Sequence, residues 1–211
     1  EKLRAFPAIS TAVRDALDSG QMSREQFAKG IETIIDPWLL DQCGPRERRH
    51  LELCLVYEGT RRIRAALIET LAPLGIDVYG DTEWQQIHNR CFGDVGYFDA
   101  LAPLYRSTAI NINSTSIQMA SAVNQRVFDC PAAGGFLITD AQDDLDTFFE
   151  PGRECAVYRT PDELVELIAR YRADSGERRR MTAQAQARIF AHHTHAHRLK
   201  ALENFLRDRF A

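Results

Sequence analysis

Arg126 and Asp129 are two charged side chains whose spacing could serve a ligand. They lie three residues apart in a stretch whose apolar residues recur at helical intervals, and residues three apart on a helix share a face. The alternative is a surface ion pair between the two side chains, which would contribute at most about 1 kcal/mol. The spacing by itself leaves both interpretations open.

Polar residues also follow two predicted strands that flank this helix. The segments 109–113 and 136–139 are apolar enough to form short strands. The helix between them can be capped by Ser114, Thr115 or Ser116 and is expected to end at Gly134, where a positive φ costs little. Such a βαβ unit belongs to a parallel sheet, and these sheets bind ligands beyond the carboxyl ends of their strands. The residues at this predicted rim are Asn113, Ser114 and Asp140.

An anion site is predicted in a second unit of the same kind. Residues 51–57 (LELCLVY) are expected to form a strand, 63–72 a helix, and 76–79 a strand that closes at Gly80. A glycine in the turn between them would let the backbone approach a phosphate, and the helix start favours an anion. The turn contains Gly59, Arg61 and Arg62. Alternatively, the two arginines are solvated charges, because no glycine fingerprint of a dinucleotide site or a P-loop is present.

Histidine and cysteine do not predict a metal site. His88 and Cys91 are close in sequence, but two ligands without a second pair are weak evidence, and a packed core pair is the alternative. His193 and His197 have i,i+4 spacing without an H-E-x-x-H motif. The alternative there is a helix junction whose histidines cap, stack or face solvent.

The composition favours a globular protein of one large domain or slightly more. The chain has 211 residues, 45% of them hydrophobic, and a net charge of −4, which implies no general affinity for nucleic acid or anionic membranes. Its five cysteines form no C-x-x-C pair, as is typical of reduced thiols in a cytoplasmic protein. No apolar run approaches the roughly 20 residues that span a bilayer.

The order of predicted elements favours an α/β fold. Residues 1–46 are expected to be a helical prefix that packs on a sheet or on a missing domain, and 47–211 to be a sheet domain with a helical tail. A helix start is predicted at Thr160, with Pro161 and Glu163 following it. The chain begins without an initiator methionine or a signal peptide, which is consistent with a fragment of a longer protein.

A family resemblance follows from the central segment. The run from Arg126 to Asp140, RVFDCPAAGGFLITD, resembles the R-x-F-E-x-x-A-x-G-G-F-L-L-T-D signature of CgeB-like (spore maturation protein B) glycosyltransferases. These resemble the C-terminal, donor-binding half of group 1 glycosyltransferases with the GT-B fold, a Rossmann-like parallel sheet flanked by helices. The resemblance covers about residues 51–206. It includes the segments 59–62, 78–80, 148–154 and 158–164, and His193-Thr194-His195 with Arg198.

The resemblance implies a nucleotide-sugar donor site. Asp129 fills the place of the acidic residue that holds the ribose hydroxyls, and a carboxylate can accept two hydrogen bonds from a vicinal diol. Arg126 is placed for the diphosphate, because its planar fork of donors suits two phosphate oxygens. Ser121 stands where the first acidic residue of the family would fall, and a hydroxyl cannot replace a carboxylate. The predicted donor-binding residues are Gly59, Arg61, Arg62, Gly80, Asn113, Ser114, Arg126 and Asp129.

The implied reaction is transfer of a sugar from a nucleotide-diphosphate sugar to an acceptor that the sequence does not identify. Arg126, with Arg61 or Arg62, would stabilise charge on the leaving diphosphate, assisted by a helix start at Ser114. A mechanism without metal or cofactor is expected. The acceptor site and any base would lie in an N-terminal GT-B half outside this chain, so the chain is expected to bind the donor without necessarily turning over alone.

Two other functions stay open. A non-catalytic binding or scaffolding module that kept the fold is favoured by Ser121. A nucleotide-dependent oxidoreductase with a doubly wound sheet is disfavoured by the missing glycine fingerprint. The glycosyltransferase predicts binding of a nucleoside diphosphate that is lost on Arg126→Ala, the module predicts no such binding, and the oxidoreductase predicts affinity for NAD or FAD.

Overall fold

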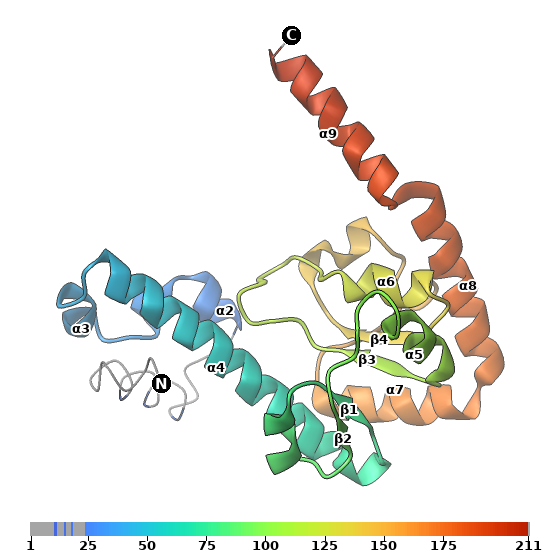
Figure 1. The fold of residues 1–211 in the computed structure, drawn as a ribbon, viewed down its shortest axis with the longest axis horizontal. Helices are drawn as coiled ribbons and strands as arrows, with labels where there is room; N and C mark the ends of the chain where they lie inside the picture. Colours follow the sequence, from blue (N-terminus) through green and yellow to red (C-terminus); the bar gives the residue numbers. More distant parts are fainter. Residues whose placement is uncertain (1–10, 12–14, 16–17, 19–23, 211) are drawn as a thin grey trace. The chain divides into compact units, whose positions relative to one another are not determined.

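The computed structural model describes residues 24–210, together with Thr11, Asp15 and Asp18 (Figure 1). Of the helical prefix predicted over 1–46, the other residues before position 24 lie outside the described part. The chain divides into two compact units. The first contains the described residues up to Ile76, with Gln85–Arg90 and Ser116–Ala120, and the second contains Asp77–Trp84, Cys91–Thr115 and the described residues from Ser121 onward. The predicted boundary between residues 46 and 47 stays a prediction.

The first unit is helical in its described part. Its core consists of aliphatic side chains from the short helices, from the turn that follows η2 and from the long helix α4: Ile31, Ile34, Ile35, Leu40, Leu51 and Leu55. The helix α3 begins with Pro37 at its first position, and the carboxylate of Asp36 caps it by accepting from the Trp38 N–H at 2.8 Å. The elements are α2 (Arg24–Ala28), η2 (Ile31–Thr33), α3 (Pro37–Asp41), α4 (Pro45–Leu71) and η3 (Ala72–Leu74).

The strand predicted over 51–57 is wrong, because these residues lie inside α4. Leu51 and Leu55 are fully buried, whereas Leu53 and Tyr57 are exposed. Burial at a spacing of four is the helical pattern, and a short apolar run does not by itself distinguish a buried strand from a buried helix. The helix continues through Gly59 and beyond, so the predicted turn and the second βαβ unit do not exist.

The second unit is a Rossmann-like α/β domain, which confirms the predicted fold class. Three parallel strands lie in the order β3-β4-β5, and β1 pairs with β2 in a separate parallel ribbon. The helix α6 packs on β3 and β4, α7 packs on β5, and α8 packs against both helices (Figure 1). The strands are β1 (Val78–Tyr79), β2 (Cys91–Phe92), β3 (Asn111–Asn113), β4 (Leu137–Asp140) and β5 (Ala156–Tyr158). The helices are α5 (Leu101–Ser107), α6 (Arg126–Ala132), η5 (Asp143–Thr147), α7 (Pro161–Ala173), α8 (Ser175–His192) and α9 (His195–Phe210), and η4 (Thr82–Gln86) follows β1.

The strand β4 is the centre of this domain. All four of its residues are buried, as expected for a parallel strand that is covered on both faces. Its register places Thr139 opposite Asn113 of β3 and Asp140 opposite Tyr158 of β5. The carboxyl ends of the three strands therefore bring their polar residues to one edge of the sheet, as predicted for 109–113 and 136–139.

The helix predicted between these strands is much shorter than expected. Residues 114–125 form no helix, and α6 begins only at Arg126. Asp140 binds the backbone N–H and the hydroxyl of Thr115, which holds the chain away from a helix start at Ser114. The side chain of Asn124 instead accepts from the Arg126 N–H at 3.0 Å. The helix stops before Gly134, whose φ is 89°, as predicted.

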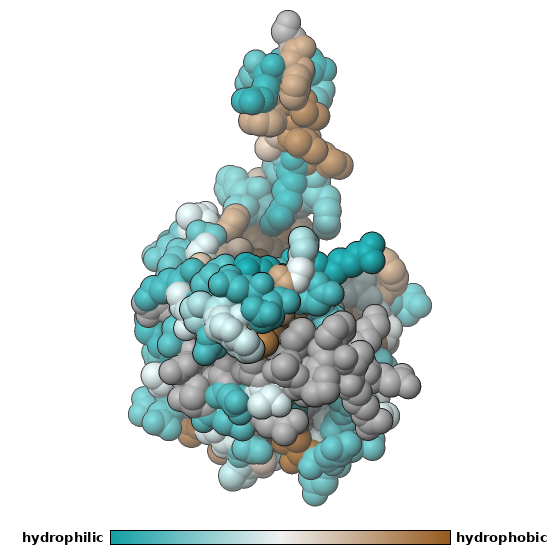
Figure 2. Space-filling view, turned by 90° about the vertical axis from the view of Figure 1, so that its left-hand side faces the viewer, coloured by the Kyte–Doolittle hydropathy of each residue, from teal (hydrophilic) through white to brown (hydrophobic). Residues whose placement is uncertain are grey.

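The helical tail follows its predicted pattern. Thr160 accepts from the Glu163 N–H at 3.2 Å, and Pro161 occupies the first position of α7. The last helix, α9, contains no buried residue, and apolar side chains lie along one side of it (Figure 2). These exposed side chains are Leu199, Leu202, Phe205, Leu206 and Phe210. Within the described residues, no helix combines the length and apolarity needed to cross a bilayer.

Candidate functional site

Asn113 lies at the carboxyl end of β3 and is almost completely buried. Its Nδ2 donates to Thr139 Oγ1 at 3.0 Å, and its backbone oxygen accepts from the Tyr158 hydroxyl at 2.9 Å. Its Oδ1 accepts from Asn124 Nδ2 at 2.9 Å and from Arg126 Nη1 at 3.4 Å. Through its side-chain amide and its backbone oxygen, Asn113 thus joins the ends of all three strands to the start of α6, where the sequence predicted a rim.

Asp140 has a structural role at this edge of the sheet. Its carboxylate accepts from the Thr115 N–H at 2.9 and 3.1 Å, from Thr115 Oγ1 at 2.9 Å and from Gln142 Nε2 at 3.3 Å. Buried charges need such partners, and Asp140 is only 6% exposed. Asp140 therefore holds the segment after β3 in place.

Arg126 and Asp129 are brought to the same short helix, as predicted, but within the described residues they form no ion pair with each other. Arg126 is exposed, and among the residues that the structure describes its guanidinium makes one long hydrogen bond, of 3.4 Å, to Asn113. The Asp129 carboxylate is partly buried and accepts from the Tyr97 hydroxyl through Oδ2 at 2.7 Å. The surface ion pair is thus excluded as the explanation of their spacing.

Tyr97 is a site residue that sequence reasoning missed, and Tyr105 is a core residue near it. The hydrogen bond to Asp129, followed by burial and by the nearby negative charge, raises the pKa of the Tyr97 phenol. Burial raises the pKa of Tyr105 to about 12, and Cys130 and Asp129 act in the same direction. Both phenols therefore stay protonated at neutral pH. No sequence spacing links position 97 to position 129, because the contact crosses 32 residues.

Ser121 is also part of a cross-chain contact. Its hydroxyl donates to Asp144 Oδ2 at 2.9 Å, and its backbone oxygen accepts from the Asp144 N–H at 3.1 Å. Asp144 lies in η5, which directly follows β4 and its loop. A carboxylate from another element is therefore held beside the position where the resemblance implied an acidic residue.

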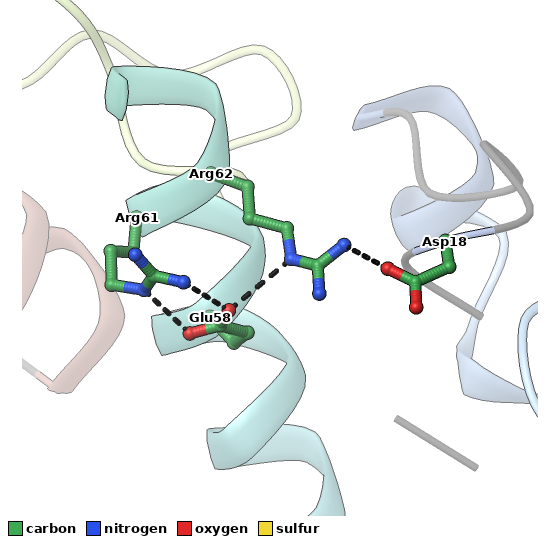
Figure 3. A network of polar contacts seen from close by, with 4 residues as sticks. All are labelled: Asp18, Glu58, Arg61 and Arg62. Atoms are coloured by element: carbon green, nitrogen blue, oxygen red, sulfur yellow. Dashed lines mark hydrogen bonds and ion pairs between the residues drawn. The ribbon is translucent and has the colours of Figure 1, made fainter. Parts of the chain in front are cut away.

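Gly59, Arg61 and Arg62 do not lie in a turn. All three are in the middle of α4 in the first unit. Arg61 binds Glu58 through two bonds of 2.6 and 2.7 Å, and Arg62 bridges Glu58 at 3.2 Å and Asp18 at 2.6 Å (Figure 3). These arginines, Arg61 first, hold the pKa of Glu58 below its ordinary value although its partial burial acts in the opposite direction. Contact between these three residues and the nucleotide-sugar donor stays a prediction, although the turn on which it was based is not formed.

Gly80 and Ser114 follow strands of two different sheets. Gly80 comes after β1, and its N–H donates to the Phe92 oxygen at 3.2 Å. A Cβ at this glycine would lie 3.1 Å from the Trp84 ring, so its small size serves local packing. Ser114 directly follows Asn113 at the end of β3, but no helix starts there, and the predicted assistance from a helix dipole at Ser114 is wrong.

The histidines have structural environments. His88 is buried, and its Nε2 bonds the Ile76 oxygen at 2.8 Å, which confirms the core alternative for His88, whereas Cys91 is only partly buried. His193 packs among Phe128, Phe148 and Phe149, and burial, the largest cause, lowers its pKa. His197 Nδ1 bonds Thr194 Oγ1 at 2.7 Å. Among the residues that the structure describes, no three His, Cys, Asp or Glu side chains are grouped as metal ligands.

Comparison with known proteins gives one family match. A family model described as "Glycosyl transferase-like" matches residues 60–204, more than half of the chain. The matched region includes the three-stranded sheet, α6 and the polar edge around Asn113. No curated protein matches the chain.

Proposed function

Because this chain belongs to the glycosyl transferase-like family, we propose that it is the donor-binding domain of a GT-B glycosyltransferase. Glycosyl transfer is the activity of the family, and a nucleotide-diphosphate sugar is the donor that we assign. The observation that carries this proposal is the arrangement of Arg126 and Asp129, which share a helix at the edge of a parallel sheet without pairing with each other. The finer assignment to the CgeB-like group rests on the run Arg126–Asp140.

Asp129 is assigned to the ribose. The Tyr97 hydroxyl donates to Oδ2 of Asp129, and among the described residues no hydrogen bond to Oδ1 is seen. A carboxylate can accept several hydrogen bonds, two of them from a vicinal diol. The ribose hydroxyls of the nucleotide are the matching donors.

Arg126 is assigned to the diphosphate. Its guanidinium is exposed, and within the described part of the chain binding of a ligand would displace only the 3.4 Å hydrogen bond to Asn113. The fork of donors in the guanidinium fits two phosphate oxygens. Transfer breaks the bond between the anomeric carbon and the phosphate oxygen, and the electron pair stays on the diphosphate. A positive charge held there stabilises the transition state. The acceptor oxygen forms the new bond, and we assign the group that takes its proton to the N-terminal GT-B half.

Asp144 is assigned to the sugar. Ser121 cannot supply a carboxylate, but its hydroxyl holds one in place at 2.9 Å. Asp144 is half-buried, and charge-assisted hydrogen bonds from sugar hydroxyls to a fixed carboxylate are strong. The second candidate function, a non-catalytic module, is favoured only by the presence of serine at position 121.

The experiment is calorimetric titration of the chain with UDP, GDP, ADP and TDP, and with their sugar conjugates. One nucleotide is expected to bind, and at 100 times its dissociation constant it adds about 2.7 kcal/mol of stability. Arg126→Ala and Asp129→Ala are expected to lose this binding. Asp208→Ala and Arg209→Ala, which change exposed residues of α9, are the matched controls and should bind as the wild type does.

Asp144→Asn separates the sugar contact from the nucleotide contacts. This variant should weaken binding of the sugar conjugate about tenfold and leave the affinity for the nucleoside diphosphate unchanged, since one charge-assisted hydrogen bond contributes about 1.5–3 kcal/mol. If no nucleoside diphosphate binds the wild type, the donor-binding proposal is overturned in favour of the non-catalytic module.

A further inference from the structure

Two aromatic side chains beside Asp129 are not used by the proposed chemistry. Tyr97 places its hydroxyl 2.7 Å from Asp129 Oδ2, and the ring of the next residue, Phe98, meets the Tyr97 ring edge to face with 5.2 Å between centroids. Phe98 is 89% exposed, more than any other large apolar side chain in the described part of the chain. An aromatic pair is thus presented to solvent next to the ribose-binding carboxylate.

The segment that carries this pair is loosely packed. It lies between β2 and α5 and has no regular structure until just before the helix. A Cβ at Gly93 or Gly96 would meet no atom within 4 Å, so the space around the two glycines is open. The Gly96 oxygen accepts from the N–H groups of Ala100 and Leu101 at 3.1 Å, which ties this residue to the start of α5. The rings can therefore adjust to a ligand at little cost in packing.

The chemistry of the pair selects one part of a nucleotide. Neither ring carries a formal charge, so neither is suited to the diphosphate, which we assign to Arg126. A base is attached to the same ribose whose hydroxyls contact Asp129, and bases stack on aromatic side chains in a way that tolerates any base. The ring closest to Asp129 is tied to its carboxylate by the Tyr97 hydroxyl, which leaves the neighbouring exposed ring for the base.

We propose that Phe98 stacks on the base of the bound nucleotide and that Tyr97 is a positioning residue that orients the Asp129 carboxylate toward the ribose. This inference rests on the proposed donor site and adds a base subsite to it. The Phe98 ring makes no hydrogen bonds to the base, so it should add similar affinity for purine and for pyrimidine nucleotides. Tyr97 acts through Asp129 and not on the ligand directly.

The first test is titration of Phe98 variants with the nucleoside diphosphate that binds the wild type. Phe98→Ala should weaken binding about tenfold, which lies within the range for loss of one base–aromatic stack. Phe98→Leu keeps an apolar side chain but has no ring, so it should bind the nucleotide nearly as weakly as Phe98→Ala does. Phe98→Trp keeps an aromatic ring and should bind with wild-type affinity. Phe205→Ala removes an exposed phenylalanine of α9 and is the matched control, with no expected change.

The second test separates the role of Tyr97 from a general structural role. Tyr97→Phe removes only the hydroxyl and should weaken binding several-fold in the wild-type background. The same change should have a smaller effect when Asp129 is already asparagine, which keeps a side-chain oxygen for the ligand but not the carboxylate that Tyr97 orients, because contacting residues give non-additive effects in a double-mutant cycle. Absorbance titration should also show the pKa of the Tyr97 phenol falling toward its ordinary value in Asp129→Asn, since the carboxylate raises it.

The outcomes distinguish this inference from the donor site itself. If Asp129→Ala abolishes binding while Phe98→Ala binds as the wild type does, the base subsite is wrong and the donor site stands. Equal effects of Tyr97→Phe in both backgrounds would overturn the positioning role. If no nucleoside diphosphate binds, or if Asp129→Ala binds normally, the donor site fails and this inference fails with it.

Discussion

Asp129 and Asp140 are both carboxylates of the second unit, and they differ in how their oxygens are used. Asp140 accepts hydrogen bonds from buried neighbours that include Thr115, Gln142 and Thr139. Within the described part of the chain, the Asp129 carboxylate accepts one hydrogen bond, from a tyrosine hydroxyl whose side chain is itself partly exposed. A carboxylate whose oxygens already accept hydrogen bonds from buried groups stabilises the fold. A carboxylate near the surface whose oxygens can accept further hydrogen bonds can bind a ligand.

Asp140→Ala is expected to destabilise the protein by about 2–4 kcal/mol. The change leaves the buried N–H and hydroxyl of Thr115 without their acceptor, and unsatisfied buried donors are costly. Asp143→Ala removes an exposed carboxylate three residues later and should change stability by less than about 0.5 kcal/mol. Urea denaturation followed by circular dichroism measures both variants. Equal stability of the two would show that Asp140 does not hold the Thr115 segment.

At the scale of the elements, the parts that local chemistry determines were predictable. The cap formed by Thr160 and Glu163, the apolar strand β4 and the stop of α6 at Gly134 depend on neighbouring residues. The segment after β3 was not predictable, because Asp140 fixes Thr115 across 25 residues and replaces the expected helix start.

The error at 51–57 has a different origin. The apolar run suits a buried strand and a buried helix equally, and only burial of Leu51 and Leu55 on one side of α4 shows which was formed. Prediction of the site residues from the sequence was limited in the same way. Arg126 and Asp129 could be found because they share one helix, whereas Tyr97 and Asp144 reach the site from other elements. Arg61 and Arg62 were misplaced together with the strand that was expected to precede them.

Gly135→Ala tests how tightly α5, α6 and β4 are joined. A Cβ at Gly135 would lie 2.7 Å from the Tyr105 oxygen and 2.8 Å from Cys130 Sγ. Backbone and core would have to shift, and overpacking of this kind costs about 1–3 kcal/mol. Gly93→Ala adds the same methyl group where no atom lies within 4 Å and should be neutral or slightly stabilising. Thermal unfolding compares the two, and an unchanged melting temperature for Gly135→Ala would contradict this packing.

At the scale of the whole molecule, α9 differs from the other long helices. The helices α7 and α8 each bury three residues in the second unit, whereas α9 buries none. Its link to the domain includes the Arg198 guanidinium over the Phe128 ring at 4.8 Å. Exposed apolar stripes favour association, and the stripe of leucine and phenylalanine side chains gives α9 this property (Figure 2).

Removal of α9 should therefore leave the fold intact and reduce self-association. A chain that ends at Thr194 loses the cation–π contact of Arg198, which is worth about 0.5–1 kcal/mol at an exposed site, and its melting temperature should fall by only a few degrees. A chain that ends at Ala187 also loses the buried Ile189 and should be far less stable, because removal of a buried aliphatic side chain costs several kcal/mol. Thermal unfolding and light scattering measure the two effects. If the chain that ends at Thr194 unfolds or aggregates more readily than the full chain, α9 is part of the cooperative fold and its apolar stripe is not what drives association.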